Sequence, residues 1–284
     1  MKMEQNKLNE LKSFAAKIRL GALKGVHAAA SGHPGGSLSI ADILAYLYTC
    51  EMKIDASNPK WADRDRLVLS KGHTAPALYA ALANKGFFPV EELAKLRQVD
   101  SFLQGHPDMK HTPGVDMTTG SLGLGISAAC GMALAAKIDG KDYRTYAIVG
   151  DGESEEGQVW EAAMFAAHYN LDNLCVIIDW NGLQIDGPVT EVMNPTPHDT
   201  KLEAFGFNVI SIDGHDFEQI EAAFNAAKEC KGKPTAIIAR TVKGKGVSYM
   251  ENQVGWHGNA PKDDQYEIAV AEIEASLSEN GGNA

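Results

Sequence analysis

Short apolar runs alternate along the chain with segments in which apolar residues recur at helical spacing. Continuous apolar runs indicate strands buried on both faces, and they lie at residues 66–70, 146–149, 174–179, 207–212 and 235–240. Helical spacing is found at residues 8–26, 40–48, 75–82, 121–138, 155–167, 217–230 and 265–277. This alternation predicts an α/β fold, with a mostly parallel sheet and helices on both of its faces.

The segment from residue 146 to residue 182 predicts one parallel crossover. The strand at 146–149 is closed by Gly150, a helix follows from about residue 155, and the strand at 174–179 leads into Trp180 and Asn181. A crossover between parallel strands is right-handed. We therefore expect Asp151 and Asn181 at the same edge of the sheet, where open α/β sheets bind ligands.

Asp151 and Asn181 together suggest a cation and phosphate site. A Gly-Asp-Gly tripeptide alone is more often a tight strand-to-helix turn, so the interpretation depends on Asn181. Mg²⁺ prefers hard oxygen ligands and usually keeps several from phosphate and water. Gly150 and Gly152 would let phosphate oxygens approach the backbone, and a helix that follows directs free N–H groups toward them.

Composition narrows the possible partners. The 284 residues are 44% hydrophobic, enough for one α/β domain over residues 1–284 with a frayed tail at 279–284. The formal net charge of −11 argues against nucleic acid and anionic membrane as partners. A phosphate-bearing ligand would therefore depend on local groups.

Cysteines and hydropathy predict a cytoplasmic location. Four dispersed cysteines without a CxxC pair are typical of reduced thiols. The polar N-terminus does not have the apolar stretch of a signal peptide, and no apolar run of 18 residues occurs.

Four of the nine histidines adjoin glycine in predicted loops, where a side chain can reach a ligand: His33, His73, His106 and His257. The others are interpreted as structural residues, with His215 in a turn. The histidines do not form the HxxxH or HExxH pair of a typical zinc site, which disfavours zinc.

Several segments match, in the same order, the motifs of one enzyme family. They are residues 31–35 (SGHPG), 70–73 (SKGH), 105–107 (GHP), 118–123 (TTGSLG), 150–152 (GDG) with Asn181, and 256–258 (WHG). From about residue 11 to about residue 261, the chain resembles the N-terminal part of transketolase, a thiamine diphosphate-binding fold.

The resemblance implies a cofactor, thiamine diphosphate, bound with Mg²⁺, for which Ca²⁺ or Mn²⁺ can substitute. It implies Asp151, Asn181 and the carbonyl of Leu183 as metal ligands. The implied cofactor contacts are His73, Gly120, Ser121, Leu122, Gly152, Asn181, Ile185, Lys243 and His257. The implied catalytic histidines, which contact sugar hydroxyls and move protons, are His33, His106 and His257.

The implied reaction is reversible transfer of a two-carbon ketol group from a ketose phosphate to an aldose phosphate, as in the pentose phosphate pathway. The chain departs from the family at Gly36, where several relatives have serine, and at Leu124, where glutamine is common.

Transketolases usually continue into a pyrimidine-binding domain that supplies an activating glutamate. Glu153, Glu155 and Glu156 follow the metal motif on the diphosphate side and cannot be assumed to replace that glutamate. We therefore expect the N-terminal subunit of a two-gene transketolase, joined by a C-terminal subunit in an α2β2 heterotetramer.

Other classes stay open. One is another thiamine-dependent ketol or acyl transferase, such as the α subunit of a dehydrogenase or a deoxyxylulose-phosphate synthase. The second is a cofactor-binding or regulatory subunit that has lost catalysis. The third is a nicotinamide dehydrogenase. Residues 120–125 match the GxGxxG turn of such enzymes only loosely, and no strong strand precedes them.

Overall fold

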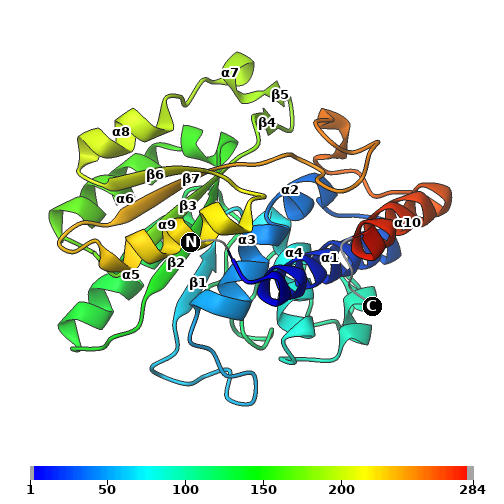
Figure 1. Cartoon of the computed structure of the whole chain (residues 1–284), viewed down its shortest axis with the longest axis horizontal. Coiled ribbons are helices and arrows are strands. Elements are labelled where there is room, and N and C mark those ends of the chain that lie inside the picture. The colour runs from blue at the N-terminus through cyan, green and yellow to red at the C-terminus, as the bar shows by residue number, and fades with distance from the viewer. Residues whose placement is uncertain (1–2, 280–284) are drawn as a thin grey trace.

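The computed structural model describes residues 3–279, which form a sheet with helices on both sides (Figure 1). The tail predicted at residues 279–284 lies, after Glu279, outside the described residues. The strands are β1 (Arg66–Leu69), β2 (Thr145–Gly150), β3 (Leu174–Trp180), β4 (Leu183–Gln184), β5 (Gly187–Pro188), β6 (Asn208–Asp213) and β7 (Thr235–Arg240). The α-helices are α1 (Gln5–Ala28), α2 (Pro34–Ser39), α3 (Ala41–Tyr46), α4 (Ala75–Asn84), α5 (Leu124–Ile138), α6 (Gly157–His168), α7 (Val189–Val192), α8 (His198–Phe205), α9 (Phe217–Glu229) and α10 (Asp263–Glu279). No helix among residues 3–279 combines enough length with enough apolar character to cross a lipid bilayer.

The main sheet has five parallel strands in the order β1-β2-β3-β7-β6. The chain builds β1, β2 and β3 in sequence, then crosses to the far edge for β6 and returns through α9 to place β7 beside β3. From β1 to β3, each new strand is added on the same side of the one before it, whereas β7 is added on the opposite side of β6. The order of addition therefore reverses between β3 and β7. Open α/β sheets bind ligands beyond the carboxyl ends of their strands at such a point.

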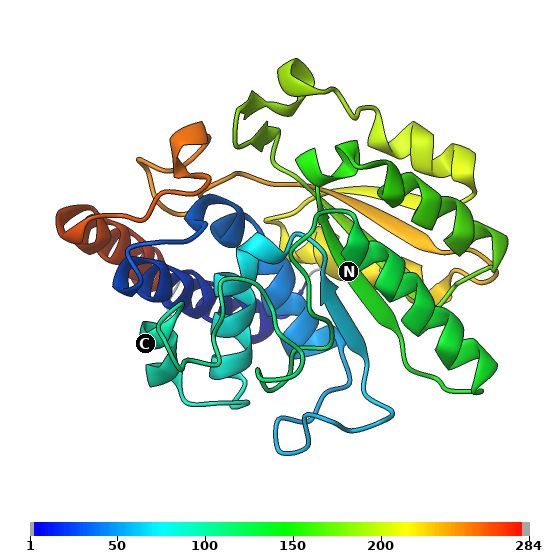
Figure 2. The same ribbon diagram turned by 180° about the vertical axis from the view of Figure 1, so that it is seen from behind.

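Two apolar layers cover the sheet. Alternate strand residues such as Ile148 and Ile177 pack with α1, α3, α4 and α9, whereas their neighbours Val149 and Ile178 pack with α5, α6 and α8. Figure 2, seen from behind, shows α5 and α6 across one face, with α8 beside them. Strands buried on both faces explain the continuous apolar runs of the sequence. The predicted α/β class, a mostly parallel sheet with helices on both faces, is confirmed.

The predicted elements differ from the observed ones mainly at their ends. The helix expected from residue 121 begins at Leu124, because Gly123 adopts a left-handed backbone with φ of 82°. The helix expected from residue 155 begins at Gly157, after a 3₁₀ turn at Gly152–Glu155. The helix expected at 40–48 ends at Tyr46 and continues as a π-helical segment at Leu47–Glu51.

Two further elements fall in segments for which the sequence predicted a loop or nothing regular. The loop predicted around His33 contains the start of α2, with Pro34 at the first helical position, where its missing N–H costs nothing. After β3, the antiparallel pair β4-β5 forms a short hairpin. Both elements border the pocket described next.

Candidate functional site

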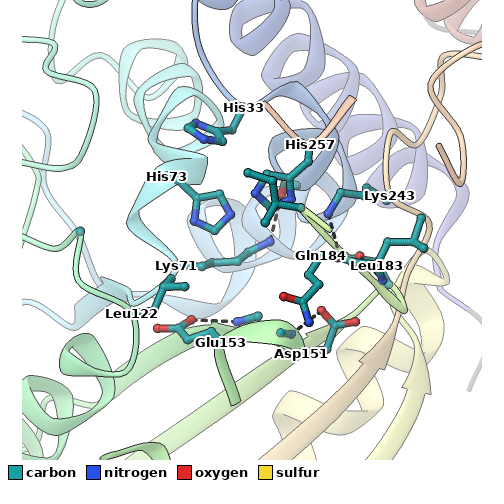
Figure 3. A pocket seen from close by; sticks show the side chains of 16 residues that line it. His33, Lys71, His73, Leu122, Asp151, Glu153, Leu183, Gln184, Lys243 and His257 are labelled. Carbon is teal, nitrogen blue, oxygen red and sulfur yellow. Dashed lines mark hydrogen bonds between the residues drawn. The ribbon is translucent and has the colours of Figure 1, made fainter. Parts of the chain in front are cut away.

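A cavity of about 290 Å³ lies beyond the carboxyl ends of the central strands. Its lining consists of His33, Gly36, Lys71, His73, Gly120, Leu122, Gly150, Asp151, Gly152, Glu153, Asn181, Leu183, Gln184, Ile185, Lys243 and His257. Figure 3 shows His33, His73 and His257 gathered on one side of the pocket, with Asp151 and Glu153 near the strand ends on the other. The pocket therefore brings together segments that are up to 224 residues apart in the sequence, from His33 to His257.

Asp151 follows the last residue of β2 and is buried. Its Oδ1 accepts a hydrogen bond from the Gly152 N–H at 2.8 Å, and its Oδ2 accepts one from the Gly182 N–H at 2.5 Å. Burial, helped by the negative charge of Asp179, raises the pKa of Asp151 to about 6. The ionised form of a buried carboxylate with a raised pKa is stabilised by a nearby cation.

Asn181 and Leu183 supply two further oxygens after β3. The Asn181 side chain donates to Asp179 Oδ2 at 3.0 Å, and its Oδ1 accepts from the Leu183 N–H at 3.2 Å. The Leu183 carbonyl accepts a hydrogen bond from Lys243 Nζ at 2.8 Å. An ammonium group therefore already contacts one oxygen of the set expected to bind a metal.

Lys243 lies in the segment that follows β7, and its side chain is 2% exposed. Burial lowers the pKa of Lys243 to about 8, although the charge of Asp151 opposes that shift. The backbone there is fixed, because the Gly244 N–H donates to the Gly35 carbonyl at 2.9 Å. Lys243 is thus a buried cation at the pocket wall.

Lys71 and Asp179 form a buried ion pair beneath the pocket. Lys71 Nζ lies 2.5 Å from Asp179 Oδ2, with 2% and 0% of the side chains exposed, and also donates to the Gly36 carbonyl at 3.0 Å. Asp179 Oδ2 accepts a further hydrogen bond from Ser39 Oγ at 2.8 Å, and Oδ1 accepts one from the Thr241 hydroxyl. Burial alone would raise the pKa of Asp179, but the Lys71 charge and these hydrogen bonds hold it below its ordinary value.

Glu153 organises the turn after Asp151. Its carboxylate accepts hydrogen bonds from the Gly150 N–H at 2.9 Å, the Gly123 N–H at 2.9 Å and Ser70 Oγ at 2.6 Å. Burial raises the pKa of Glu153. These contacts tie the ends of β1 and β2 to the turn before α5.

Three imidazoles lie close together on the opposite side. The ring centroids of His33 and His73 are 5.1 Å apart, those of His73 and His257 are 5.2 Å apart, and those of His33 and His257 are 5.6 Å apart. Burial is the main cause that lowers the pKa of His33 to about 4, that of His257 to about 3, and that of His73 well below its usual value. These rings are therefore neutral near pH 7, and each can donate and accept one hydrogen bond.

Two of the three rings have an unused nitrogen. His33 Nδ1 and His257 Nδ1 are buried without a hydrogen-bond partner among the described residues. Buried polar atoms normally have partners, so these two ring nitrogens lack a hydrogen bond that buried groups usually make. Within residues 3–279, no three His, Cys, Asp or Glu side chains are placed so that they could hold a metal ion by themselves.

Four expected residues lie at the margin of the pocket: His106, Gly120, Ser121 and Ile185. Gly120 lines it, and a Cβ at Gly120 would stand 3.5 Å from His106 Cγ, so the largely exposed His106 packs just behind this wall. Ser121 is exposed and outside the lining. Ile185, in the β4-β5 hairpin, lines the pocket but is 60% exposed.

The structure gives a physical reason for the departure at Gly36. A Cβ at this position would meet Thr74 Cγ2 at 2.8 Å, so serine would not fit without a shift of Thr74. Leu124, the other departure, is 49% exposed at the start of α5.

Sequence reasoning missed four residues of the pocket or its support: Lys71, Asp179, Gln184 and His198. His198 is buried beneath Asp151, where its Nε2 lies 2.9 Å from Ser154 Oγ, and Ser154 donates to the Asp151 carbonyl at 2.5 Å. Lys71 stood inside the SKGH motif, which was the available signal. Asp179 was visible only as an acidic residue ending an apolar run.

The family described as "Transketolase, thiamine diphosphate binding domain" matches residues 11–276. The chain belongs to this family. Its transketolase fold is also seen in a solved transketolase from Pichia stipitis in complex with sedoheptulose-7-phosphate, with a TM-score of 0.87 and 34% identity, over 96% of this chain and 44% of that one. The predicted resemblance and the predicted thiamine diphosphate-binding fold are confirmed.

Two similar relatives have nearly the length of this chain. The 6-deoxy-6-sulfo-D-fructose transketolase subunit SqwG of Clostridium sp. (strain MSTE9) is 50% identical over 93% of this chain and 96% of the relative. One subunit of the apulose-4-phosphate transketolase of Phocaeicola vulgatus is 43% identical over 96% of this chain and 98% of the relative. The chain thus spans almost all of two transketolase subunits and less than half of the solved transketolase.

Proposed function

We propose that this chain is the thiamine diphosphate-binding, N-terminal subunit of a split transketolase. The observation that carries the proposal is the pocket at the reversal point of the sheet, where oxygen ligands, buried ammonium groups and neutral imidazoles meet. When bound, thiamine diphosphate supplies the carbon nucleophile and the electron sink for breaking a C–C bond beside a ketose carbonyl. The protein residues bind, orient and exchange protons.

Asp151, Asn181 and the Leu183 carbonyl fit a Mg²⁺ ion in the chemistry of their oxygens. Support comes from the raised pKa of Asp151, caused by burial, and from the Lys243 ammonium group on the Leu183 carbonyl. Both features indicate that positive charge is favourable at this point. Ca²⁺ and Mn²⁺, which also take oxygen ligands, are proposed as substitutes.

The diphosphate would lie against Gly152, His73 and the two buried lysines. Lys71 and Lys243 line the pocket, and each is 2% exposed. They provide local positive charge in a chain whose formal net charge is −11. Gly152 lines the pocket with its N–H on Asp151 Oδ1 at 2.8 Å, and a Cβ there would stand 3.0 Å from Gln184 Cβ. The cofactor rings would contact the pocket wall formed by Gly120, Leu122 and Ile185, with Ser121 exposed beside it.

His33, His106 and His257 are proposed to hold the sugar hydroxyls and to move protons. His33 and His257 each keep a buried ring nitrogen without a partner among the described residues. Because both rings are neutral near pH 7, they can accept a proton from one hydroxyl and donate to another. A deoxyxylulose-phosphate synthase-like activity would use the same cofactor end and is the alternative that substrate assays would decide.

We propose a ketose with an anionic group as donor, because the two subunit relatives are named for a sulfonated and a phosphorylated sugar. Sugars of the pentose phosphate pathway belong to this class. The same relatives support a C-terminal partner subunit, which we propose to form an α2β2 heterotetramer with this chain. We also propose that residues 1–284 fold as one domain, and that the protein is cytoplasmic because the four cysteines are free thiols.

The test is calorimetric titration of thiamine diphosphate into the chain, with and without Mg²⁺. Wild type is expected to bind in a Mg²⁺-dependent manner, and Asp151→Asn is expected to lose that dependence because a charged oxygen ligand is gone. Asp186→Asn is the matched control, since it removes the same charge from an exposed residue of the β4-β5 turn. Unchanged affinity in Asp151→Asn would refute the assignment of the metal site.

The activity test adds the partner subunit. Ketol transfer is expected from the mixture of the two subunits but not from either of them in isolation. Full transfer by this chain without its partner would overturn the proposed dependence.

A further inference from the structure

Arg97 connects the two loops that carry His33 and His106. Its Nη1 donates a hydrogen bond to Ser31 Oγ at 2.9 Å, two residues before His33. Its guanidinium also occupies the space beside Gly105, where a Cβ would stand 2.9 Å from Arg97 Nε and 3.1 Å from Cζ. Gly105 directly precedes His106, so one side chain lies against both histidine loops.

The backbone around Arg97 is held in an unusual form. Arg97 has φ of 60°, a left-handed conformation that is uncommon for residues other than glycine. Its N–H donates to the Leu103 carbonyl at 2.9 Å, and Leu103 itself is buried. A constrained conformation of this kind at the edge of a site points to a role for the side chain that it directs.

The far side of the second loop is anchored as well. The Tyr79 hydroxyl lies 2.8 Å from the His106 carbonyl and 3.0 Å from the Gln104 carbonyl. With Tyr79 holding the backbone of this loop from within the core, the Arg97 guanidinium closes it against the Ser31 segment.

Arg97 is exposed, and among residues 3–279 its guanidinium has no carboxylate partner. Its positive charge is therefore not neutralised by a salt bridge within the described residues and, in addition to burial, it contributes to the lowered pKa values of His33 and His106. The charged and titratable groups that face His33 are Arg97, His106, Lys243, His73 and His257. The charged group that faces His106 is Arg97, which together with burial lowers the pKa of His106.

We propose that Arg97 is a positioning residue that clamps the His33 loop to the His106 loop and so aligns both imidazoles for the sugar hydroxyls. This inference rests on the proposed function. The guanidinium donates to Ser31 Oγ and at the same time fills the space beside Gly105, which the single ammonium group of a lysine cannot do.

The experiment compares wild type, Arg97→Gln, Arg97→Lys and Gly105→Ala in the complex with the partner subunit. Lys110→Gln is the matched control, since it removes an exposed positive charge four residues after His106. Each enzyme is assayed with a phosphorylated ketose and with a neutral ketose, erythrulose, as donors. Calorimetry measures thiamine diphosphate binding in parallel.

Arg97→Gln and Gly105→Ala are expected to raise the donor KM by about 3- to 10-fold, the effect of one lost hydrogen bond. The rise should be the same for both donors, while cofactor affinity stays at the wild-type value. A loss confined to the phosphorylated donor would overturn the clamp and make Arg97 a contact of the anionic group. Unchanged kinetics in both variants would also overturn it.

Histidine titration by NMR gives a second readout that does not need activity. Arg97→Gln should raise the pKa of His33 and His106, whereas Arg97→Lys, which keeps the charge, should not. In the assay, the acidic limb of kcat/KM should move to higher pH in Arg97→Gln alone. If wild type showed no ketol transfer with any donor, the proposed function would fail, and the NMR titration would still show whether the Arg97 charge lies beside both imidazoles. Unchanged pKa values of His33 and His106 in Arg97→Gln would overturn the clamp.

Discussion

The buried ion pair between Lys71 and Asp179 predicts a large effect of one substitution on stability. Lys71→Met keeps most of the side-chain volume but leaves Asp179, which is 0% exposed, without its cation. Removing one partner of a buried ion pair typically costs about 3–5 kcal/mol. Three hydrogen-bond donors remain on Asp179, from Ser39, Asn181 and Thr241, so we expect the lower half of that range.

The pH dependence has a definite sign. Because the folded-state pKa of Asp179 lies below its ordinary value, the pair stabilises wild type above about pH 4, the unfolded value for Asp. This stabilisation is lost as pH falls through the folded pKa. In Lys71→Met, burial is no longer opposed by the lysine and raises the pKa of Asp179. The difference between wild type and variant should therefore shrink from pH 8 toward pH 5.

Urea unfolding followed by circular dichroism at pH 8, 6.5 and 5 measures this difference. Lys137→Met is the control, since its pair with Asp172 is partly exposed and should contribute less than about 1 kcal/mol. The double variant Lys71→Met/Asp179→Asn should recover part of the loss, because the uncompensated charge is gone. Equal, pH-independent losses in Lys71→Met and Lys137→Met would refute the reasoning.

Two further predictions concern the fold around the site. In α5, Gly125→Ala would place a Cβ 2.6 Å from Ser70 Cα and should cost about 1–3 kcal/mol, whereas Gly131→Ala, with nothing within 4 Å, should stabilise by up to about 1 kcal/mol; thermal melting separates the two. Asp216 caps α9 by accepting from the Glu218 and Gln219 N–H groups at 2.9 and 3.2 Å, so Asp216→Ala should cost about 1 kcal/mol. Hydrogen bonds from Gln219 lower the pKa of Asp216, so this cost should be present at pH 7 and disappear as pH falls through the folded value, as denaturant unfolding at pH 7 and pH 3 would show.

The sheet could be predicted from the sequence because its strands are buried on both faces. A continuous apolar run is a strong signal when its length is short and glycine or a polar turn follows it. The helix ends were less predictable. Gly123 decided the start of α5 through a left-handed backbone, and the sequence alone does not distinguish that use of glycine from close helix packing.

The site could be predicted only as far as its motifs reached. Asp151 and Asn181 follow strands, so the sheet topology alone places them at one edge. Lys71 and Asp179 were missed because their roles depend on a contact between the turn after β1 and the end of β3, strands that are separated by β2 in the sheet. His198 was missed because only the packing of α8 beneath Asp151 buries it. Such contacts depend on tertiary structure and have no local pattern.

The two buried aspartates at this edge differ in what balances their charge. Asp179 has Lys71 at 2.5 Å and several hydrogen-bond donors, and its pKa is lowered. Asp151 has two backbone N–H donors, and Lys243 contacts the neighbouring Leu183 carbonyl at 2.8 Å; its pKa is raised. In the folded chain Asp179 is therefore stable as an anion without any ligand, whereas ionised Asp151 would be favoured by an added cation. Adjacent strands thus carry one carboxylate that secures the sheet edge and one that is available to bind a ligand.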